Sequence, residues 1–134
     1  MSTSQQISTG IVLMAVIGIA YGGKFMLSVV NGKAPANDLQ KTYFRAGHAH
    51  AGVLVVLGLV VRLLLNESAV PGWASALADL VLFAAIAMPA GFFLSVVGRD
   101  PQHTNRFRYL IAAGGIMLIL GLAAAGIGLI VGAP

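Results

Sequence analysis

Residues 107–131 read FRYLIAAGGIMLILGLAAAGIGLIV, and this stretch decides the fold. Its one charged side chain is Arg108, near the start, and almost all the other residues are apolar or small. A helix needs about 20 consecutive, mostly apolar residues to cross the hydrocarbon core of a membrane. The stretch therefore predicts a transmembrane helix.

The composition of the whole chain supports the same class of protein. Of its 134 residues 58% are hydrophobic and 9% are charged, and the mean hydropathy is +0.91. A soluble domain carries about 25% charged residues. So few charged side chains cannot cover a soluble surface, whereas helices in lipid need charge only at the two rims of the membrane. We therefore expect an integral membrane protein.

Three further apolar runs, 7–30, 44–65 and 73–97, resemble 107–131 in length and composition. Together the four runs use most of the chain, so residues 1–134 are expected to form a single integral membrane domain. The predicted fold is all-α, a four-helix transmembrane bundle with up-and-down topology. Pro89 removes a backbone donor and predicts a kink within residues 88–91. Thr104 or Asn105 is expected to cap the fourth helix.

Small residues recur along the fourth run at four-residue spacing, which allows another helix to approach closely. Two uses of this face remain open, packing inside the molecule and self-association into a homo-oligomer. The residues are Gly121, Ala124, Ala125, Gly128 and Gly132.

The basic residues lie on one predicted side of the membrane. Only Arg62 borders the second connection. By the positive-inside rule, the connections 31–43 and 98–106 are cytoplasmic and both termini are outside. The pI near 10 is then explained by basic residues at the cytoplasmic rim, where they contact anionic lipid headgroups. We expect no nucleic-acid partner. The basic residues beside the first and third connections are Lys24, Lys33, Lys41, Arg45, Arg99, Arg106 and Arg108.

The histidine segment, residues 44–52, reads FRAGHAHAG and is the most informative polar stretch. Two residues apart on a helix, His48 and His50 are separated by about 200°, so a regular helix cannot aim both at one ion. Arg45 and His48 are three residues apart and share a face. Counting outward from the first connection places Lys24 at the level of His48. Lys24, Arg45, His48 and His50 are therefore the candidate ligand-binding residues.

The same count at the second connection pairs two charged residues, Arg62 and Asp79. Charged side chains within a membrane are costly unless they pair with one another. We therefore predict a structural Arg62–Asp79 ion pair. The alternative is that the Asp79 carboxylate handles a proton or cation.

Three functions remain open on the residues alone. The first is a non-catalytic accessory or ligand-binding protein with its site at the cytoplasmic end of spans one and two. The second is a redox protein that binds haem b or a metal ion through His48, His50 or His103, because neutral imidazole is a good metal ligand. The third is an oligomeric channel or transporter for a small anion or proton. No cysteine, phosphate-binding glycine loop, Ser-His-Asp order or paired carboxylate indicates catalysis.

Two resemblances involve the histidine segment. Together with Tyr21-Gly22-Gly23, it resembles small four-helix integral membrane proteins of actinobacteria, which implies a bacterial inner-membrane location and the same fold but no activity. Its His-x-His pattern is also similar to helix starts in haem-copper oxidases and nitric-oxide-response membrane proteins. That similarity implies haem or copper chemistry. The interiors of the other spans lack histidine, so a complete oxygen-reducing centre is not expected.

Overall fold

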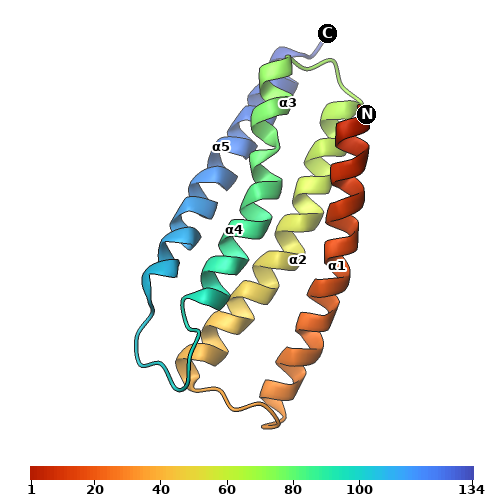
Figure 1. The fold of residues 1–134 in the computed structure, drawn as a ribbon. Helices are drawn as coiled ribbons and strands as arrows, with labels where there is room; N and C mark the ends of the chain where they lie inside the picture. Colours follow the sequence, from red (N-terminus) through yellow and green to blue (C-terminus); the bar gives the residue numbers. More distant parts are fainter.

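The computed structural model describes all residues, 1–134, and contains helices and their connections without strands. Figure 1 shows the helices side by side along the molecule. The helices are α1 (Thr3–Val30), α2 (Asp38–Asn66), α3 (Gly72–Ala78), α4 (Leu80–Leu94), the 3-10 turn η1 (Arg106–Arg108) and α5 (Tyr109–Val131).

Four helical segments are long and apolar enough to cross a membrane: α1, α2, α3 with α4, and η1 with α5. Successive segments run in opposite directions, so both termini lie at one end of the molecule (Figure 1). We call this the termini end. The opposite end, which we call the basic end, holds the connections 31–37 and 95–105. The predicted all-α, up-and-down transmembrane bundle is confirmed.

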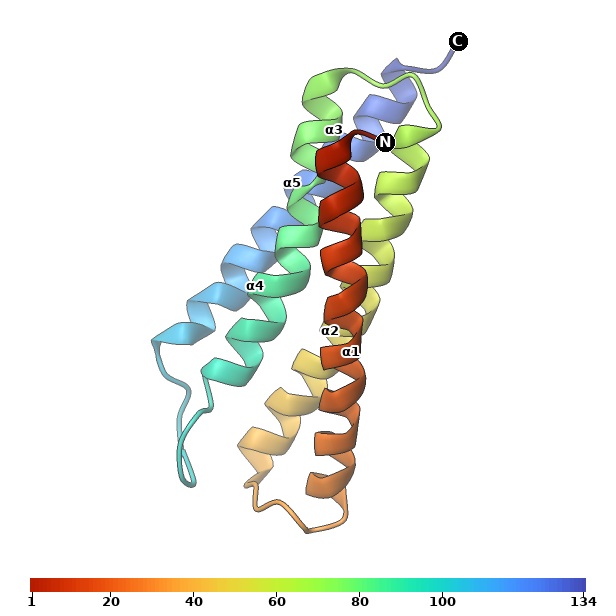
Figure 2. The same ribbon diagram turned by 45° about the vertical axis from the view of Figure 1, so that its right-hand side comes forward.

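The helices are arranged more as a row than as a closed square. α1 contacts only α2, α2 packs mainly on α4, and α5 packs on α3 and α4. Figure 1 shows α1 and α5 at opposite edges of this row, and in the turned view of Figure 2 α1 crosses in front of α2. Only Met26 and Val29 of α1 are buried. Lipid chains are as apolar as the side chains of α1, so no hydrophobic effect drives α1 against α2. Such limited packing stabilises the position of α1 only weakly.

Glycines let α5 approach α3 and α4 closely. A Cβ built on Gly114 would lie 2.9 Å from the Met88 backbone nitrogen, and one on Gly121 would lie 3.0 Å from that of Val81. Two turns further along α5, a Cβ on Gly128 would collide with the Ala74 side chain. The small residues thus pack inside the molecule, which was one of the two predicted uses. Gly121, Ala124, Ala125 and Gly128 are buried there.

The second helix begins earlier than predicted, at Asp38 instead of residue 44. Asn37 and Gln40 form a capping box: the Gln40 N–H donates to Asn37 Oδ1 at 2.9 Å, and the Asn37 N–H donates to Gln40 Oε1 at 3.1 Å. This box satisfies donors that a helix start leaves unpaired. The first connection therefore shortens to 31–37, and the histidine segment lies inside α2.

The third span also differs from its predicted course. The helix breaks at Asp79, between α3 and α4, while α4 continues through Pro89 without interruption. It ends at Leu94, before residue 97, because Asn105 takes over the neighbouring carbonyls: its side chain donates to Leu94 O at 2.8 Å and its N–H to Ser95 O at 2.9 Å. Asn105 Oδ1 also accepts from the Phe107 N–H at 2.8 Å, which confirms it as a cap.

Candidate functional site

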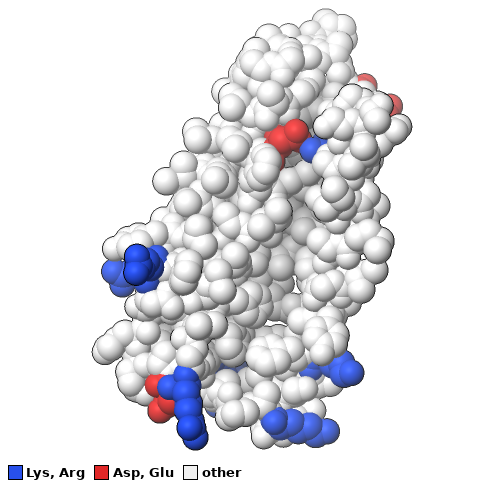
Figure 3. All heavy atoms as spheres, viewed as in Figure 1, with Lys and Arg blue, Asp and Glu red and all other residues white.

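The basic side chains gather at one end of the molecule. Figure 3 shows Lys and Arg at the lower end and on the lower left flank, with one blue group beside red in the upper part. The connections 31–37 and 95–105 lie in that lower region (Figure 1). Lys24 and Arg45 are exposed there. The predicted concentration of basic residues at one end of the molecule is therefore present in the structure.

His48 lies in a notch made by two glycines of α1. A Cβ built on Gly22 would be 3.4 Å from His48 Nδ1, and one on Gly23 would be 3.5 Å from His48 Nε2. The missing side chains of these glycines allow the imidazole to rest against the α1 backbone. Lys24 follows the notch directly, so His48 and Lys24 lie at similar levels, as the count from the first connection expected.

His50 faces a different helix. Its Nδ1 lies 2.7 Å from Ala46 O, one turn back in α2, and its ring stacks on Phe92 of α4 with 5.0 Å between centroids. His48 and His50 therefore contact different neighbours, as helical geometry requires. The structure does not place His50 at the same site as His48.

The histidines do not assemble into a metal site. His103 is exposed in the connection 95–105, and no three His, Cys, Asp or Glu side chains in the structure come close enough to hold a metal ion. The predicted set of His48, His50 and His103 is thus spread over three surroundings. It is not brought together as one group of ligands.

An apolar groove runs along α1 and α2 from His48. We call it the α1–α2 groove. It is shallow and open, and has a volume of about 650 Å³. His48 is its one polar residue, and the other side chains are aliphatic. The groove is lined by Ile19 of α1 and by His48, Ala49, Gly52, Val53, Val56, Leu57 and Val60 of α2.

Aromatic contacts hold the histidine segment between α1 and α4. Phe44 meets Phe25 of α1 edge-on at 5.4 Å and stacks with Phe93 of α4 at 5.6 Å between centroids. A Cβ on Gly47 would lie 2.9 Å from the Phe93 ring, so glycine at this position permits the close approach. These contacts fix the rotation of α2 and hence the direction of His48.

Two side chains at the start of α2 tie the basic connections together. Asn37 Nδ2 donates to Asp100 Oδ1 at 2.9 Å and to Pro101 O at 2.7 Å. Gln40, which is buried, donates to Val96 O and Gly98 O, both at 3.1 Å. The two connections at the basic end are therefore one hydrogen-bonded unit.

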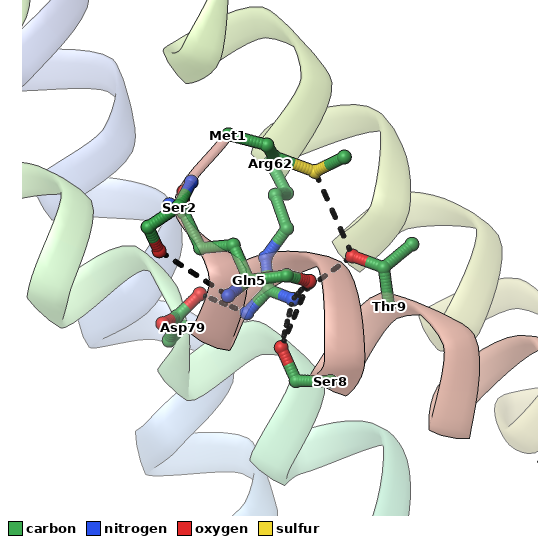
Figure 4. A network of polar contacts seen from close by, with 7 residues as sticks. All are labelled: Met1, Ser2, Gln5, Ser8, Thr9, Arg62 and Asp79. Carbon is green, nitrogen blue, oxygen red and sulfur yellow. Dashed lines mark hydrogen bonds and ion pairs between the residues drawn. The ribbon is translucent and has the colours of Figure 1, made fainter.

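A second polar cluster lies at the termini end, around Arg62 (Figure 4). Arg62 Nη2 pairs with Asp79 Oδ1 at 2.6 Å, so the two residues that the loop count pairs do meet. The Arg62 side chain is 8% exposed and that of Asp79 is 39% exposed. Arg62 Nη1 donates to Ser8 Oγ at 2.7 Å and to Thr9 Oγ1 at 3.2 Å. Arg62 of α2 therefore binds Asp79 and, through Ser8 and Thr9, also α1.

The sequence did not point to several of these partners. Ser8 and Thr9 carry no signal beyond being small and polar. In the sequence Gly22 and Gly23 stand within the apolar run 7–30 with nothing to indicate that they face His48. Asn37, followed three positions later by a glutamine, matches the capping-box pattern and could have placed the start of α2.

Comparisons with protein-family models, curated proteins and solved structures return no match. The resemblance of the histidine segment to small actinobacterial membrane proteins therefore stays a prediction.

Proposed function

We propose that this four-helix membrane protein is a non-catalytic binding protein, and that it holds an anionic group at the basic end of α1 and α2. Lys24, Arg45 and His48 are the binding residues. The anionic group is of the phosphate class, as carried by lipid headgroups and by free phosphate, because clustered cations at a membrane rim attract such groups.

The observation that carries this proposal is the placement of His48. Its ring lies in the Gly22–Gly23 notch between two helices, yet it makes no hydrogen bond within the protein, unlike His50. Arg45 is exposed one turn before His48 on α2 and Lys24 is exposed at a similar level of α1, and neither forms an ion pair with an acidic side chain. Three groups that can donate hydrogen bonds are thus free to meet an anion.

The asymmetry of charge supports an orientation as well. Basic residues concentrate on the cytoplasmic side of bacterial inner-membrane proteins. In the proposal, the connections 31–37 and 95–105 face the cytoplasm and both termini face outward. The anionic group is then taken from the cytoplasmic leaflet or from the cytoplasm.

Thermal unfolding of the detergent-purified protein tests this function. A ligand that binds only the folded state raises the unfolding temperature as its concentration rises. We expect dioleoylphosphatidylglycerol, which is anionic, to stabilise the protein at lower mole fraction than dioleoylphosphatidylcholine. One Lys or Arg near a membrane surface contributes about 1 kcal/mol, so Arg45→Gln or Lys24→Gln should raise the half-saturating amount about fivefold.

The matched control is Arg106→Gln, which removes an exposed cation from the other hairpin and should change the half-saturating amount little. Equal stabilisation by the two lipids, or equal loss in all three variants, would show that binding at Lys24 and Arg45 does not occur.

A further inference from the structure

The α1–α2 groove matches one leaflet of a bilayer in length. The twelve residue steps from His48 to Val60 correspond to about 18 Å at the rise of an α-helix. Half of a hydrocarbon core about 30 Å thick is about 15 Å. The groove is therefore about as long as one leaflet is deep, and its His48 end is the end nearer the basic connections.

The polar end of the groove is also its charged end. Arg45, Ala49, Gly52, Val56 and Val60 follow one another at spacings of three or four residues, so they lie along one face of α2. The last four line the groove, and Arg45 continues the same face beyond it. The surface is thus amphipathic along its length, with cations at one end and aliphatic side chains over the remainder.

We propose that the α1–α2 groove holds an acyl chain of an anionic phospholipid whose phosphate lies at Arg45, His48 and Lys24. This inference rests on the proposed function and names its ligand as a lipid of the same leaflet. A helix of a second copy would cross the whole membrane, whereas the groove covers about one leaflet. A free anion would leave the apolar part of the groove without a role.

A substitution at Gly52 can fill the groove and so block an acyl chain. It lines the groove, and a Cβ built there meets no atom within 4 Å, so a side chain at this position begins in open space. Gly52→Phe should therefore fold. Gly126 of α5 is exposed and equally free of neighbours, which makes Gly126→Phe the matched control.

The experiment measures stabilisation of these variants and of Arg45→Gln by dioleoylphosphatidylglycerol and, separately, by inorganic phosphate. We expect Gly52→Phe to raise the half-saturating amount of the lipid at least about threefold, which corresponds to about 0.7 kcal/mol, and to leave phosphate binding unchanged. Gly126→Phe should leave both unchanged. Inorganic phosphate should need at least about tenfold more than the lipid, because it lacks the chain.

Each other outcome is decisive. If Arg45→Gln weakens lipid binding but Gly52→Phe does not, the acyl-chain site is wrong and the proposed function stands. An equal effect of Gly52→Phe and Gly126→Phe also overturns the acyl-chain site. If phosphate binds as well as the lipid, the ligand is a free anion. If Arg45→Gln weakens neither ligand, the proposed function fails and the acyl-chain site with it.

Discussion

The Arg62–Asp79 pair is the interaction whose energy can be worked out most directly. Removing one partner of a buried ion pair costs about 3–5 kcal/mol, because the other charge is left without compensation. Asp79 keeps 39% of its side chain exposed, so the pair is only partly buried and the full cost is not expected. We expect Asp79→Asn to lower the free energy of unfolding by about 2 kcal/mol, as for a hydrogen bond to a charged group.

Arg62→Gln should cost more, about 3 kcal/mol, since Arg62 is 8% exposed and its loss also frees the hydroxyls of Ser8 and Thr9. Polar contacts between transmembrane helices average only about 0.6 kcal/mol. A coupling of about 1–2 kcal/mol between the two substitutions would therefore mark a true ion pair. The double variant should lose about 3–4 kcal/mol, less than the sum of the single losses.

The assay is unfolding in mixed micelles of increasing dodecyl sulfate content, followed by the fluorescence of Trp73, the one tryptophan, which lies in α3 close to Asp79. The pair Lys41–Asp38, at 3.3 Å on the surface, is the control, and Lys41→Gln with Asp38→Asn should show no measurable coupling. Single losses at Arg62 and Asp79 that add within about 0.5 kcal/mol would refute the reasoning.

Three further predictions follow from other contacts. Gly121→Val should destabilise the protein by about 1–3 kcal/mol in the same unfolding assay, because a Cβ at this position would lie 3.0 Å from the Val81 backbone nitrogen, while Gly126→Val should be neutral; equal effects would contradict the packing of α5. Asn37→Ala removes a helix cap worth about 0.5–2 kcal/mol and the hydrogen bonds to Asp100 and Pro101. Amide hydrogen exchange in residues 95–105 should therefore become faster. Unchanged exchange would mean that α2 does not hold this connection. The chain has no cysteine, so Ser4→Cys should react with an impermeant maleimide in intact cells and Gln102→Cys only after permeabilisation; the reverse pattern would invert the proposed orientation.

The features predicted from sequence are those that length and helical period control. Four long apolar runs separated by short connections permit little besides an up-and-down bundle, so the topology followed. The Arg62–Asp79 contact could be found because antiparallel helices place residues equidistant from their connection at the same height. The opposite directions of His48 and His50 follow from the helical turn alone.

The start of α2 and the course of α3 and α4 were missed for local reasons. Residues 38–43 are mostly polar, so hydropathy excludes them from a span even though the capping box makes them helical. Pro89 lies inside α4, which continues through it, and the kink expected within residues 88–91 stays a prediction. The break occurs instead at Asp79, whose carboxylate is held by Arg62 from the neighbouring helix.

The position of α1 and the groove could not be derived from sequence. From Gly10 to Gly23, α1 is apolar or small apart from Tyr21, so no polar pattern there indicates its neighbour. Its place is set by contacts of residues far apart in the chain, Ser8 and Thr9 with Arg62 and the glycine notch with His48. Ile19 is the one residue of α1 that lines the groove, so this side of the groove depends on α1 lying beside α2.

The most direct test of the central claim, that the basic end of α1 and α2 binds an anionic lipid, is the composition of the lipid that stays with the protein. Lipid would be extracted after mild detergent purification and compared with the membrane of origin. The account predicts enrichment of anionic over zwitterionic phospholipid in the wild-type protein, and loss of that enrichment in Arg45→Gln. A retained lipid composition equal to that of the membrane, or unchanged in Arg45→Gln, would contradict it.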